Sequence, residues 1–314
     1  MRICVAGAAG AFGLKHLDAL KAIEDVTVTC IVDHKKEALK ALADEHNINH
    51  YTTSLDEALA RDDVDAVILA TPTPMHAQQA IQCLEAGKHV EVEIPMADNI
   101  EEARRLVETQ QRTGLVAMAG HTRRFNPSHQ WIRNKILAGE LTIQQMDVQT
   151  YFFRRSNKNA LGEERSWTDH LLWHHACHTV DLFQYQTGQV AEQVQAMQGP
   201  MHPSLNIAMD MSIGMKVPNG ALCTLSLSFN NNGPFGTFFR YICDNGTYIA
   251  RYDDLFDGNE KPINLSGVTV SNNGIELQDR EFIASIREGR EPNASVAQCL
   301  PAMETLYRLE QALM

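Results

Sequence analysis

The sequence predicts an α/β domain built on a parallel sheet, followed by an α+β domain with an open, largely antiparallel sheet. Three observations support this. A glycine-rich turn joins the first strand to the first helix, apolar strands and helices alternate up to about residue 120, and long strand-like runs with hairpin signals follow. We therefore expect domain boundaries at 1–122 and 123–314.

The first 122 residues alternate regularly between strand and helix patterns. Strands are expected at 2–6, 26–32, 65–70, 89–92 and 115–119, and helices at 12–23, 35–45, 75–86 and 99–112. The strand at 65–70 is a continuous apolar run, as in a strand that is buried on both faces. Gly87 follows the third helix as a C-cap residue. This pattern predicts a parallel sheet with helices on both faces.

The pattern changes after Gly120. Strands are expected at 142–154, 190–198, 208–217, 220–229, 236–244 and 247–251, and helices at 128–138, 168–186, 275–288 and 294–312. The sequences Pro-Asn-Gly at 218–220 and Asp-Asn-Gly at 244–246 are hairpin signals. They predict neighbouring antiparallel strands in the second domain.

Composition limits the classes of partner. The formal net charge is −12, from 27 Lys and Arg against 39 Asp and Glu, so we expect no nucleic-acid partner. No apolar run reaches the roughly 18 residues of a membrane helix, so no membrane association is expected. Seven cysteines without a C-x-x-C pair predict reduced thiols in the cytoplasm and no zinc framework.

The first strand–helix turn is a candidate pyrophosphate site. Backbone N–H groups and the helix N-terminus face an anion there, and glycine lets it approach closely. The spacing is G-x-x-G-x-x-G, with Ala8 at a position where the usual motif has glycine. The turn residues expected to contact the cofactor are Gly7, Ala9, Gly10, Ala11, Phe12 and Gly13.

Residues after the second strand bear on cofactor choice. Asp33 lies 20 positions beyond Gly13, where a carboxylate accepts hydrogen bonds from the ribose 2′-OH of NAD. His34, Lys35 and Lys36 follow it, and cations there favour the 2′-phosphate of NADP. The residues alone leave NAD and NADP open.

The segment Ser166–Asp181 contains the candidate catalytic residues. Read as one helix, it places Leu171, His174, His178 and Asp181 on one stripe. Stacked imidazoles offer a proton acceptor and a group that orients it. A metal site is the alternative, since His174 and His178 have ligand spacing. His175 is turned about 100° away and H-E-x-x-H is absent, so we expect no metal.

The chain resembles the glucose–fructose oxidoreductase, inositol dehydrogenase and rhizopine-catabolism oxidoreductase family over nearly its whole length. The resemblance rests on the glycine turn and on the motifs Thr-Pro-Thr-Pro-Met-His (71–76), Glu-Val-Glu-Ile-Pro (91–95), Gly-His-Thr-Arg-Arg-Phe-Asn-Pro (120–127), His-Thr-Val-Asp (178–181) and Gln-Asp-Arg-Glu-Phe-Ile (278–283). It implies a Rossmann domain that binds NAD or NADP, and a second domain that binds substrate and forms a homodimer through its sheet. Further implied cofactor-side residues are Thr71, Pro72, Thr73, His76, Glu93, Ile94 and Pro95.

Two positions depart from the family pattern. Members normally carry a lysine where this chain has Ile94, and an aspartate where it has His174. Three runs, at 93–95, 146–155 and 167–175, instead resemble a branch that oxidises a cyclic hemiacetal bearing two carboxylates, with NADP and less readily with NAD. This implies His178 as the base, His174 or Asp181 as its partner, and Glu93 near the nicotinamide.

A small dicarboxylate hemiacetal requires cationic side chains, and the planar fork of arginine matches a carboxylate. The candidates are two adjacent pairs, Arg123 and Arg124, and Arg154 and Arg155. Trp167 and Tyr151 are candidates to flank a flat ring, although a core role fits them as well.

Two other functions remain as alternatives. A sugar or inositol dehydrogenase of the same family predicts Lys at 94 and Asp at 174, and the sequence has neither. A non-enzymatic dinucleotide sensor, as a few family members are, would need neither the histidines nor the paired arginines.

Overall fold

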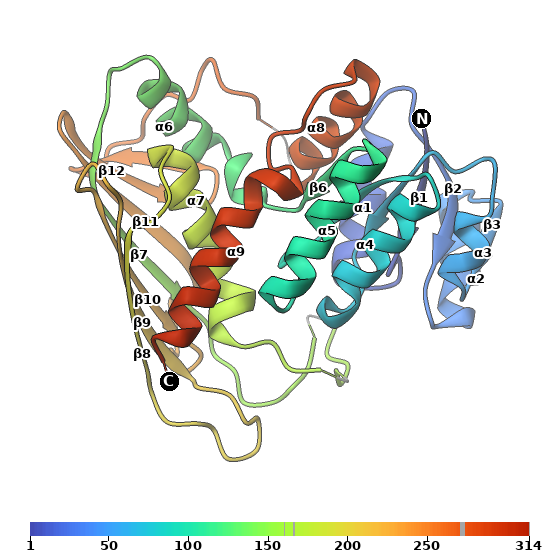
Figure 1. Ribbon diagram of the computed structural model, residues 1–314, viewed down its shortest axis with the longest axis horizontal. Helices are drawn as coiled ribbons and strands as arrows, with labels where there is room; N and C mark the ends of the chain where they lie inside the picture. The colour runs from blue at the N-terminus through green and yellow to red at the C-terminus, as the bar shows by residue number, and fades with distance from the viewer. Residues whose placement is uncertain (160, 166, 271–273, 314) are drawn as a thin grey trace. The chain divides into compact units, whose positions relative to one another are not determined.

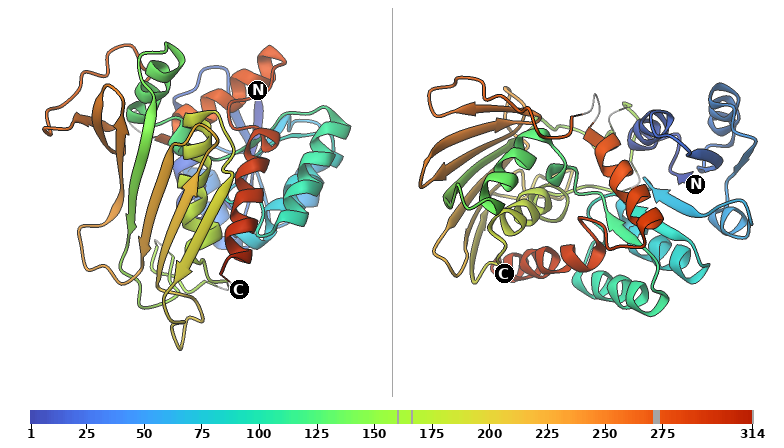
Figure 2. Two further views of the ribbon diagram at one scale, coloured as in Figure 1. Left: turned by 60° about the vertical axis from the view of Figure 1, so that its left-hand side comes forward. Right: turned by 90° about the horizontal axis from the view of Figure 1, so that it is seen from above.

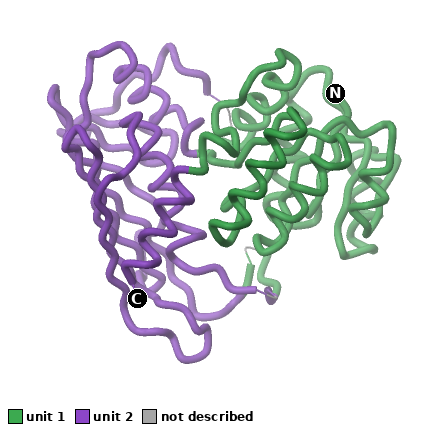
Figure 3. The backbone as a smooth tube through the Cα atoms, viewed as in Figure 1, with its two compact units in different colours: residues 1–122, 158–163, 271–300 green, residues 123–157, 164–270, 301–314 purple. Residues whose placement is uncertain are grey.

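The computed structural model describes residues 1–159, 161–165, 167–270 and 274–313. The chain divides into two compact units, which Figure 3 shows in different colours. Unit 1 comprises Met1–Thr122, Lys158–Glu163 and Ser271–Leu300, and unit 2 comprises Arg123–Asn157, Glu164–Val270 and Pro301–Met314. The sequence prediction had placed 158–163 and 271–300 in the second domain. They lie in unit 1 because contacts in space, rather than order along the chain, define a unit.

Unit 1 contains a six-stranded sheet in the order β3-β2-β1-β4-β5-β6 (Figure 1). All of its strand pairs are parallel. The strands are β1 (Arg2–Ala6), β2 (Thr27–Val32), β3 (His50–Thr52), β4 (Ala66–Leu69), β5 (His89–Val92) and β6 (Ala117–Ala119). The order reverses between β1 and β4, and in parallel sheets this switch point is where ligands bind.

Helices cover both faces of this sheet. They are α1 (Ala11–Lys21), α2 (Lys36–His46), α3 (Leu55–Leu59), α4 (His76–Glu85), α5 (Ile100–Thr113) and α8 (Gly274–Glu288). Right-handed crossovers to opposite sides of the switch point place their helices on opposite faces. Accordingly, α1 and α8 lie on one face, and α4 and α5 on the other (Figure 2). The predicted α/β class is confirmed, while β3 and α3 were missed because they are short.

Unit 2 contains a seven-stranded sheet in the order β13-β12-β11-β7-β10-β9-β8. Only the pair β7 and β10 is parallel, so the predicted largely antiparallel sheet is confirmed. The strands are β7 (Ile143–Tyr151), β8 (Gln193–Gln198), β9 (Asp210–Lys216), β10 (Leu222–Ser228), β11 (Gly236–Cys243), β12 (Gly246–Arg251) and β13 (Asp254–Asp257). The short strand β13 was not predicted.

One face of this sheet packs against helices, namely α6 (Pro127–Leu137), α7 (Cys177–Thr187) and the later part of α9 (Val296–Gln311) (Figures 1 and 2). In β7, Met146, Val148 and Thr150 are buried on that face, whereas Gln149 and Tyr151 point the other way. No helix in the described parts of the chain combines the length and the apolar character of a bilayer-spanning segment.

The histidine-rich segment differs from the single helix expected over Ser166–Asp181. Ser166 lies outside the described residues, and 167–170 are not helical. His170 has extended backbone angles, φ −121° and ψ 164°. The helix begins with a wide turn of π-helix, Leu171–Ala176, labelled η3, and continues as α7. The expected stripe is therefore wrong in its first turn, because a π-helical turn shifts the positions that share a face.

Candidate active site

The glycine turn of unit 1 has the geometry of a pyrophosphate site. Gly7 has φ +77°, and a Cβ atom there would lie 2.3 Å from the Ala70 carbonyl oxygen. A Cβ atom at Gly13 would lie 2.2 Å from the Gly7 carbonyl oxygen. Gly10 precedes α1, and no side chain caps that helix. The N–H groups of its first turn are thus available to an anion.

Asp33 is held beside this turn. One of its carboxylate oxygens accepts the N–H of Ala9 at 3.1 Å, and the other accepts the N–H of Lys35 at 3.1 Å. The Lys35 ammonium pairs with Glu163, while His34 is largely exposed beside Asp33. The carboxylate that favours NAD and the cations that favour NADP are neighbours, so both cofactors fit this environment.

His76 connects the loops that follow β4 and β5. Its Nδ1 lies 2.9 Å from the Pro95 carbonyl oxygen and its Nε2 lies 2.8 Å from that of Thr71. Burial lowers the pKa of His76, and these two hydrogen bonds oppose the shift. The Thr71 hydroxyl donates to Gln79 at 2.6 Å. These loops lie at the carboxyl ends of parallel strands, as does the glycine turn, and this is the edge at which such sheets bind dinucleotides.

Behind the cofactor-side loops lies a buried polar cluster that the sequence analysis missed. His16 of α1 is completely buried; its Nδ1 lies 2.9 Å from Asp279 Oδ1 and its Nε2 lies 3.1 Å from Glu93 Oε1. Gln278 donates to Glu91 at 2.7 Å and to Glu93 at 3.2 Å. The sequence held one signal, since Glu91 belongs to a strand expected in a sheet covered on both faces and Glu93 directly follows that strand. Carboxylates in such a place require partners.

The carboxyl groups of this cluster have different protonation preferences. Burial, together with the nearby Asp279, raises the pKa of Glu91 well above its usual range. Burial also tends to raise the pKa of Glu93, but the hydrogen bond and charge of His16, together with the hydrogen bond from Gln278, outweigh it and lower that pKa. Burial opposes a charge on His16, yet Asp279 and Glu93 raise its pKa well above normal. The cluster thus keeps Glu93 as a carboxylate and Glu91 protonated.

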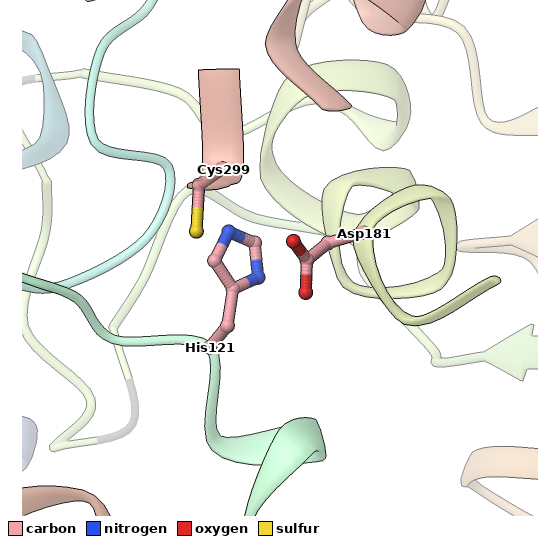
Figure 4. Close-up of side chains that lie close together, drawn as sticks. All are labelled: His121, Asp181 and Cys299. Atoms are coloured by element: carbon pink, nitrogen blue, oxygen red, sulfur yellow. The ribbon is translucent and has the colours of Figure 1, made fainter. Parts of the chain in front are cut away.

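Two predicted residues form an internal ion pair instead of contacting a ligand. Figure 4 shows Asp181 on α7, and both of its carboxylate oxygens accept hydrogen bonds from Arg124, at 2.8 and 2.6 Å. Both side chains are buried, and Arg124 also lies 4.5 Å from the ring centroid of Tyr185. This corrects the expectation that Arg124 binds substrate, because its fork is occupied inside unit 2. Whether Asp181 also orients His178 stays a prediction, since a carboxylate can accept more than the two hydrogen bonds from Arg124.

Figure 4 also shows His121 and Cys299, which belong to unit 1 and turn toward one another. Both are buried.

In unit 2, Arg123 donates to Asn126 at 3.3 Å and lies 4.9 Å from the ring centroid of Tyr252. Burial lowers the pKa of Arg123. Since Arg123 makes no bidentate pair with a carboxylate of the described residues, it stays a candidate to bind an anion.

Asp169, which precedes the helical turn that begins at Leu171, is the centre of a cationic group. Its carboxylate accepts hydrogen bonds from both terminal nitrogens of Arg154, one of them at 2.8 Å, and from Arg165. His175 Nε2 lies 3.1 Å from the same carboxylate. Burial tends to raise the pKa of Asp169, but the hydrogen bonds from His175 and Arg154 lower it far below its usual range. The sequence analysis missed Arg165, which lies four residues before Asp169 in a non-helical segment, because it did not use this i,i+4 spacing.

The geometry distinguishes the two candidate proton acceptors. His174 Nδ1 accepts the N–H of His170 at 3.1 Å, so neutral His174 carries its proton on Nε2 and acts there as a donor. Its ring lies 5.3 Å from that of Trp167, tilted by 33°. His178 is partly exposed in α7. His178 therefore remains the candidate base, and His174 becomes a candidate donor.

Two residues predicted to bind substrate lie apart from the Asp169 group. Arg155 is exposed, stacks 4.2 Å from the ring centroid of Phe153 and donates to backbone carbonyls. Tyr151 faces the helix-free side of the sheet, where its hydroxyl donates to Ser226 at 3.1 Å. The expectation for Tyr151 is corrected, because the alternation of β7 directs its side chain away from the helices of unit 2. That Arg155 binds substrate stays a prediction.

Comparison with known proteins places this geometry in a family. The oxidoreductase family with an NAD-binding Rossmann fold matches residues 1–121, and the bacterial oxidoreductase C-terminal family matches 127–269. 4-carboxy-2-hydroxymuconate-6-semialdehyde dehydrogenase from Sphingobium sp. (strain SYK-6) is 66% identical over 313 residues, covering 100% of this chain and 99% of that protein. The chain belongs to this oxidoreductase family. It is an NAD(P)-dependent dehydrogenase, as the resemblance implied.

Solved structures agree with this fold. An oxidoreductase domain protein from Kribbella flavida has a TM-score of 0.86 and 21% identity, covering 99% of this chain and 96% of that one. GenD2 from gentamicin A biosynthesis, solved in complex with NAD, has a TM-score of 0.81 and 21% identity over 99% and 93% of the two chains. At this identity the likeness concerns the fold shared by members of the oxidoreductase family.

The glycine turn yields a first prediction. Gly13→Ala should lower the melting temperature of the cofactor-free protein and weaken NAD(P) binding, because the new Cβ would overlap backbone atoms; overpacking of this kind costs about 1–3 kcal/mol. Gly10→Ala is the control, since its Cβ would meet only the Gly7 carbonyl oxygen, at 3.2 Å. Thermal unfolding and cofactor titration measure both. Equal melting temperatures for the two variants would contradict the role given to Gly13.

The buried cluster yields a prediction of opposite pH dependences. A raised folded-state pKa means that the stabilisation from Glu91 is present below the ordinary glutamate pKa of 4.5 and is lost as pH rises through the folded value. Glu91→Gln should therefore melt higher than the wild type at pH 8 and similarly near pH 4.5. Each 1 kcal/mol corresponds to roughly 2–4 °C in melting temperature.

Glu93→Gln is the matched control. Because the folded-state pKa of Glu93 is lowered, its charged form stabilises the fold above the unfolded pKa, and that contribution disappears as pH falls. This variant should melt lower than the wild type at neutral pH, with a difference that shrinks in acid. The same sign of change for both variants at pH 8 would refute the assigned protonation states.

Proposed function

We propose that this dehydrogenase oxidises the cyclic hemiacetal of 4-carboxy-2-hydroxymuconate-6-semialdehyde to 2-pyrone-4,6-dicarboxylate. The electron acceptor is NADP or NAD, and the reaction belongs to the protocatechuate 4,5-cleavage pathway for lignin-derived aromatic compounds. The observation that carries the proposal is the 66% identity, over the full length, to the Sphingobium dehydrogenase of that name. The site residues support it on chemical grounds.

The proposed oxidation removes a hydride from the hemiacetal carbon and a proton from its hydroxyl, leaving a lactone. NAD(P), when bound, accepts the hydride. His178 takes the proton, and the ring oxygen of the hemiacetal assists hydride loss, so that a neutral imidazole suffices as base. Ile94, which can neither accept nor donate a proton, is compatible with this reaction. His174 donates a hydrogen bond from Nε2 to an oxygen of the substrate and keeps its proton.

Two alternatives make different demands on these residues. A polyol dehydrogenase would rely on a lysine at position 94, where the chain has Ile94. A dinucleotide sensor would bind NAD(P) without needing a proton acceptor such as His178. Assaying the wild type with the cyclic dicarboxylate, glucose and inositol separates the three functions. Tight cofactor binding without turnover of any of them would favour the sensor.

We also propose a cytoplasmic homodimer that binds neither membrane nor nucleic acid. The support for self-association is the helix-free face of the unit 2 sheet, which mixes apolar with polar side chains, among them Tyr151, Phe238 and Ile242. Two copies should pair through this face. Phe238→Asp should therefore halve the mass measured by light scattering, and a monomeric wild type would contradict the proposal.

The proposed base can be tested directly. His178→Asn should lower kcat by about 100-fold or more, the usual contribution of a general base, while binding of the pyrone product changes little. Formation of reduced cofactor from the cyclic dicarboxylate is the measurement. His202→Asn, in the loop between β8 and β9, replaces a histidine that caps its own turn and should leave kcat unchanged. A His178→Asn variant as fast as His202→Asn would remove His178 as the base.

A further inference from the structure

The group around Asp169 carries more positive than negative charge. Its single carboxylate faces two permanent cations, Arg154 and Arg165, whose side chains are 13% and 20% exposed. In the described part of the chain, neither guanidinium pairs with a second carboxylate. Burial lowers the pKa of His175 despite its contact with Asp169, so it is neutral near pH 7. One positive charge is left uncompensated in a poorly solvated place, and such a charge favours a bound anion.

The two arginines differ in what they offer that anion. Arg154 uses both terminal nitrogens on Asp169. Arg165 uses only Nη1, and among the described residues its Nε and Nη2 atoms donate to no protein group. This edge of a guanidinium binds a carboxylate through two parallel hydrogen bonds. The geometry thus favours Arg165 over Arg154 as the residue that meets a ligand.

The neighbours of Arg165 suit a flat, anionic ring. Its guanidinium carbon lies 5.4 Å from the centroid of the Trp167 ring. The ring centroid of Trp167 lies 5.3 Å from that of His174, whose neutral form carries a proton on Nε2. The guanidinium of Arg165, the indole of Trp167 and the imidazole of His174 are therefore successive neighbours in unit 2. Aromatic rings and fixed polar groups of this kind typify sites for planar carboxylated ligands.

We propose that Arg165 binds one of the two ring carboxylates of the substrate and thereby selects dicarboxylates over monocarboxylates. The proposal rests on the proposed function and deepens it. Asp169 holds Arg154 and Arg165 together, so the carboxylate enters an existing cationic group. The bond is ionic and non-covalent, and no other reactant is required.

The test is a thermodynamic cycle between Arg165 and the ligand carboxylates. Binding of 2-pyrone-4,6-dicarboxylate, 2-pyrone-4-carboxylate and 2-pyrone-6-carboxylate is measured by calorimetry for the wild type and for Arg165→Ala and Arg165→Lys. Arg165→Ala should weaken dicarboxylate binding and raise the substrate KM by about 10- to 100-fold, the range for a lost charged hydrogen bond. It should leave the binding of one monocarboxylate unchanged, namely the one that lacks the carboxylate bound by Arg165. Arg165→Lys keeps the charge without the fork and should be intermediate.

Arg251→Ala is the matched control. Like Arg165, Arg251 pairs with one carboxylate, that of Glu260, and lies 5.5 Å from an aromatic centroid, that of Phe256. The Arg251→Ala variant should bind all three pyrones with the affinities of the wild type. Circular dichroism checks that each variant is folded.

The outcomes separate this proposal from the proposed function. If the wild type oxidises the hemiacetal but Arg165→Ala binds each of the three pyrones as tightly as the wild type does, the Arg165 proposal is overturned and the function stands. If the wild type neither oxidises the hemiacetal nor binds the dicarboxylate, both are overturned. A loss shared equally by the three ligands would also overturn the proposal, since it would indicate a general disturbance of the site.

Discussion

The buried carboxylate of Asp169 holds together the parts of unit 2 that matter for its chemistry. Arg154 comes from the segment after β7, Arg165 from the following loop and His175 from the π-helical turn, and all three contact Asp169. A buried charge is tolerated only when it is paired and hydrogen-bonded. Residues 167–170 lie outside the helix, and the extended His170 supplies the N–H that orients His174.

Unit 1 depends on a comparable arrangement. His16 lies in the helix that begins at the glycine turn, and it bonds to Glu93 after β5 and to Asp279 in α8. Three elements that are distant in sequence are joined through one imidazole. Because burial makes each of these charges costly by itself, the elements are stable only together. The cofactor-side loop containing Glu93 is thereby fixed to the same helix whose N-terminus is free for a pyrophosphate.

The departures from the family pattern fit a single chemical explanation. Polyol oxidation has an unassisted alcohol as substrate, whereas a hemiacetal loses hydride with help from its ring oxygen. The proposed reaction does not require the lysine that the family pattern has at position 94 or the aspartate that it has at position 174. In this proposal, substrate recognition depends on the two ring carboxylates, and guanidinium groups of unit 2 are the cations proposed to bind them.

The sequence by itself determined the two fold classes, the positions of nearly all helices and strands, and the family. It also determined where the glycine turn lies and that Asp33 follows the second strand. These follow from signals within short windows: apolar periodicity, turn residues and motif spacing. Only the tertiary structure decided which charged residues are paired. Arg124 proved to be bound by Asp181, while Arg165 and His16 emerged as parts of clusters. Most of these contacts join residues that folding brings together from separate elements. Even the i,i+4 spacing of Arg165 and Asp169 did not show that Arg154 and His175 would share the same carboxylate.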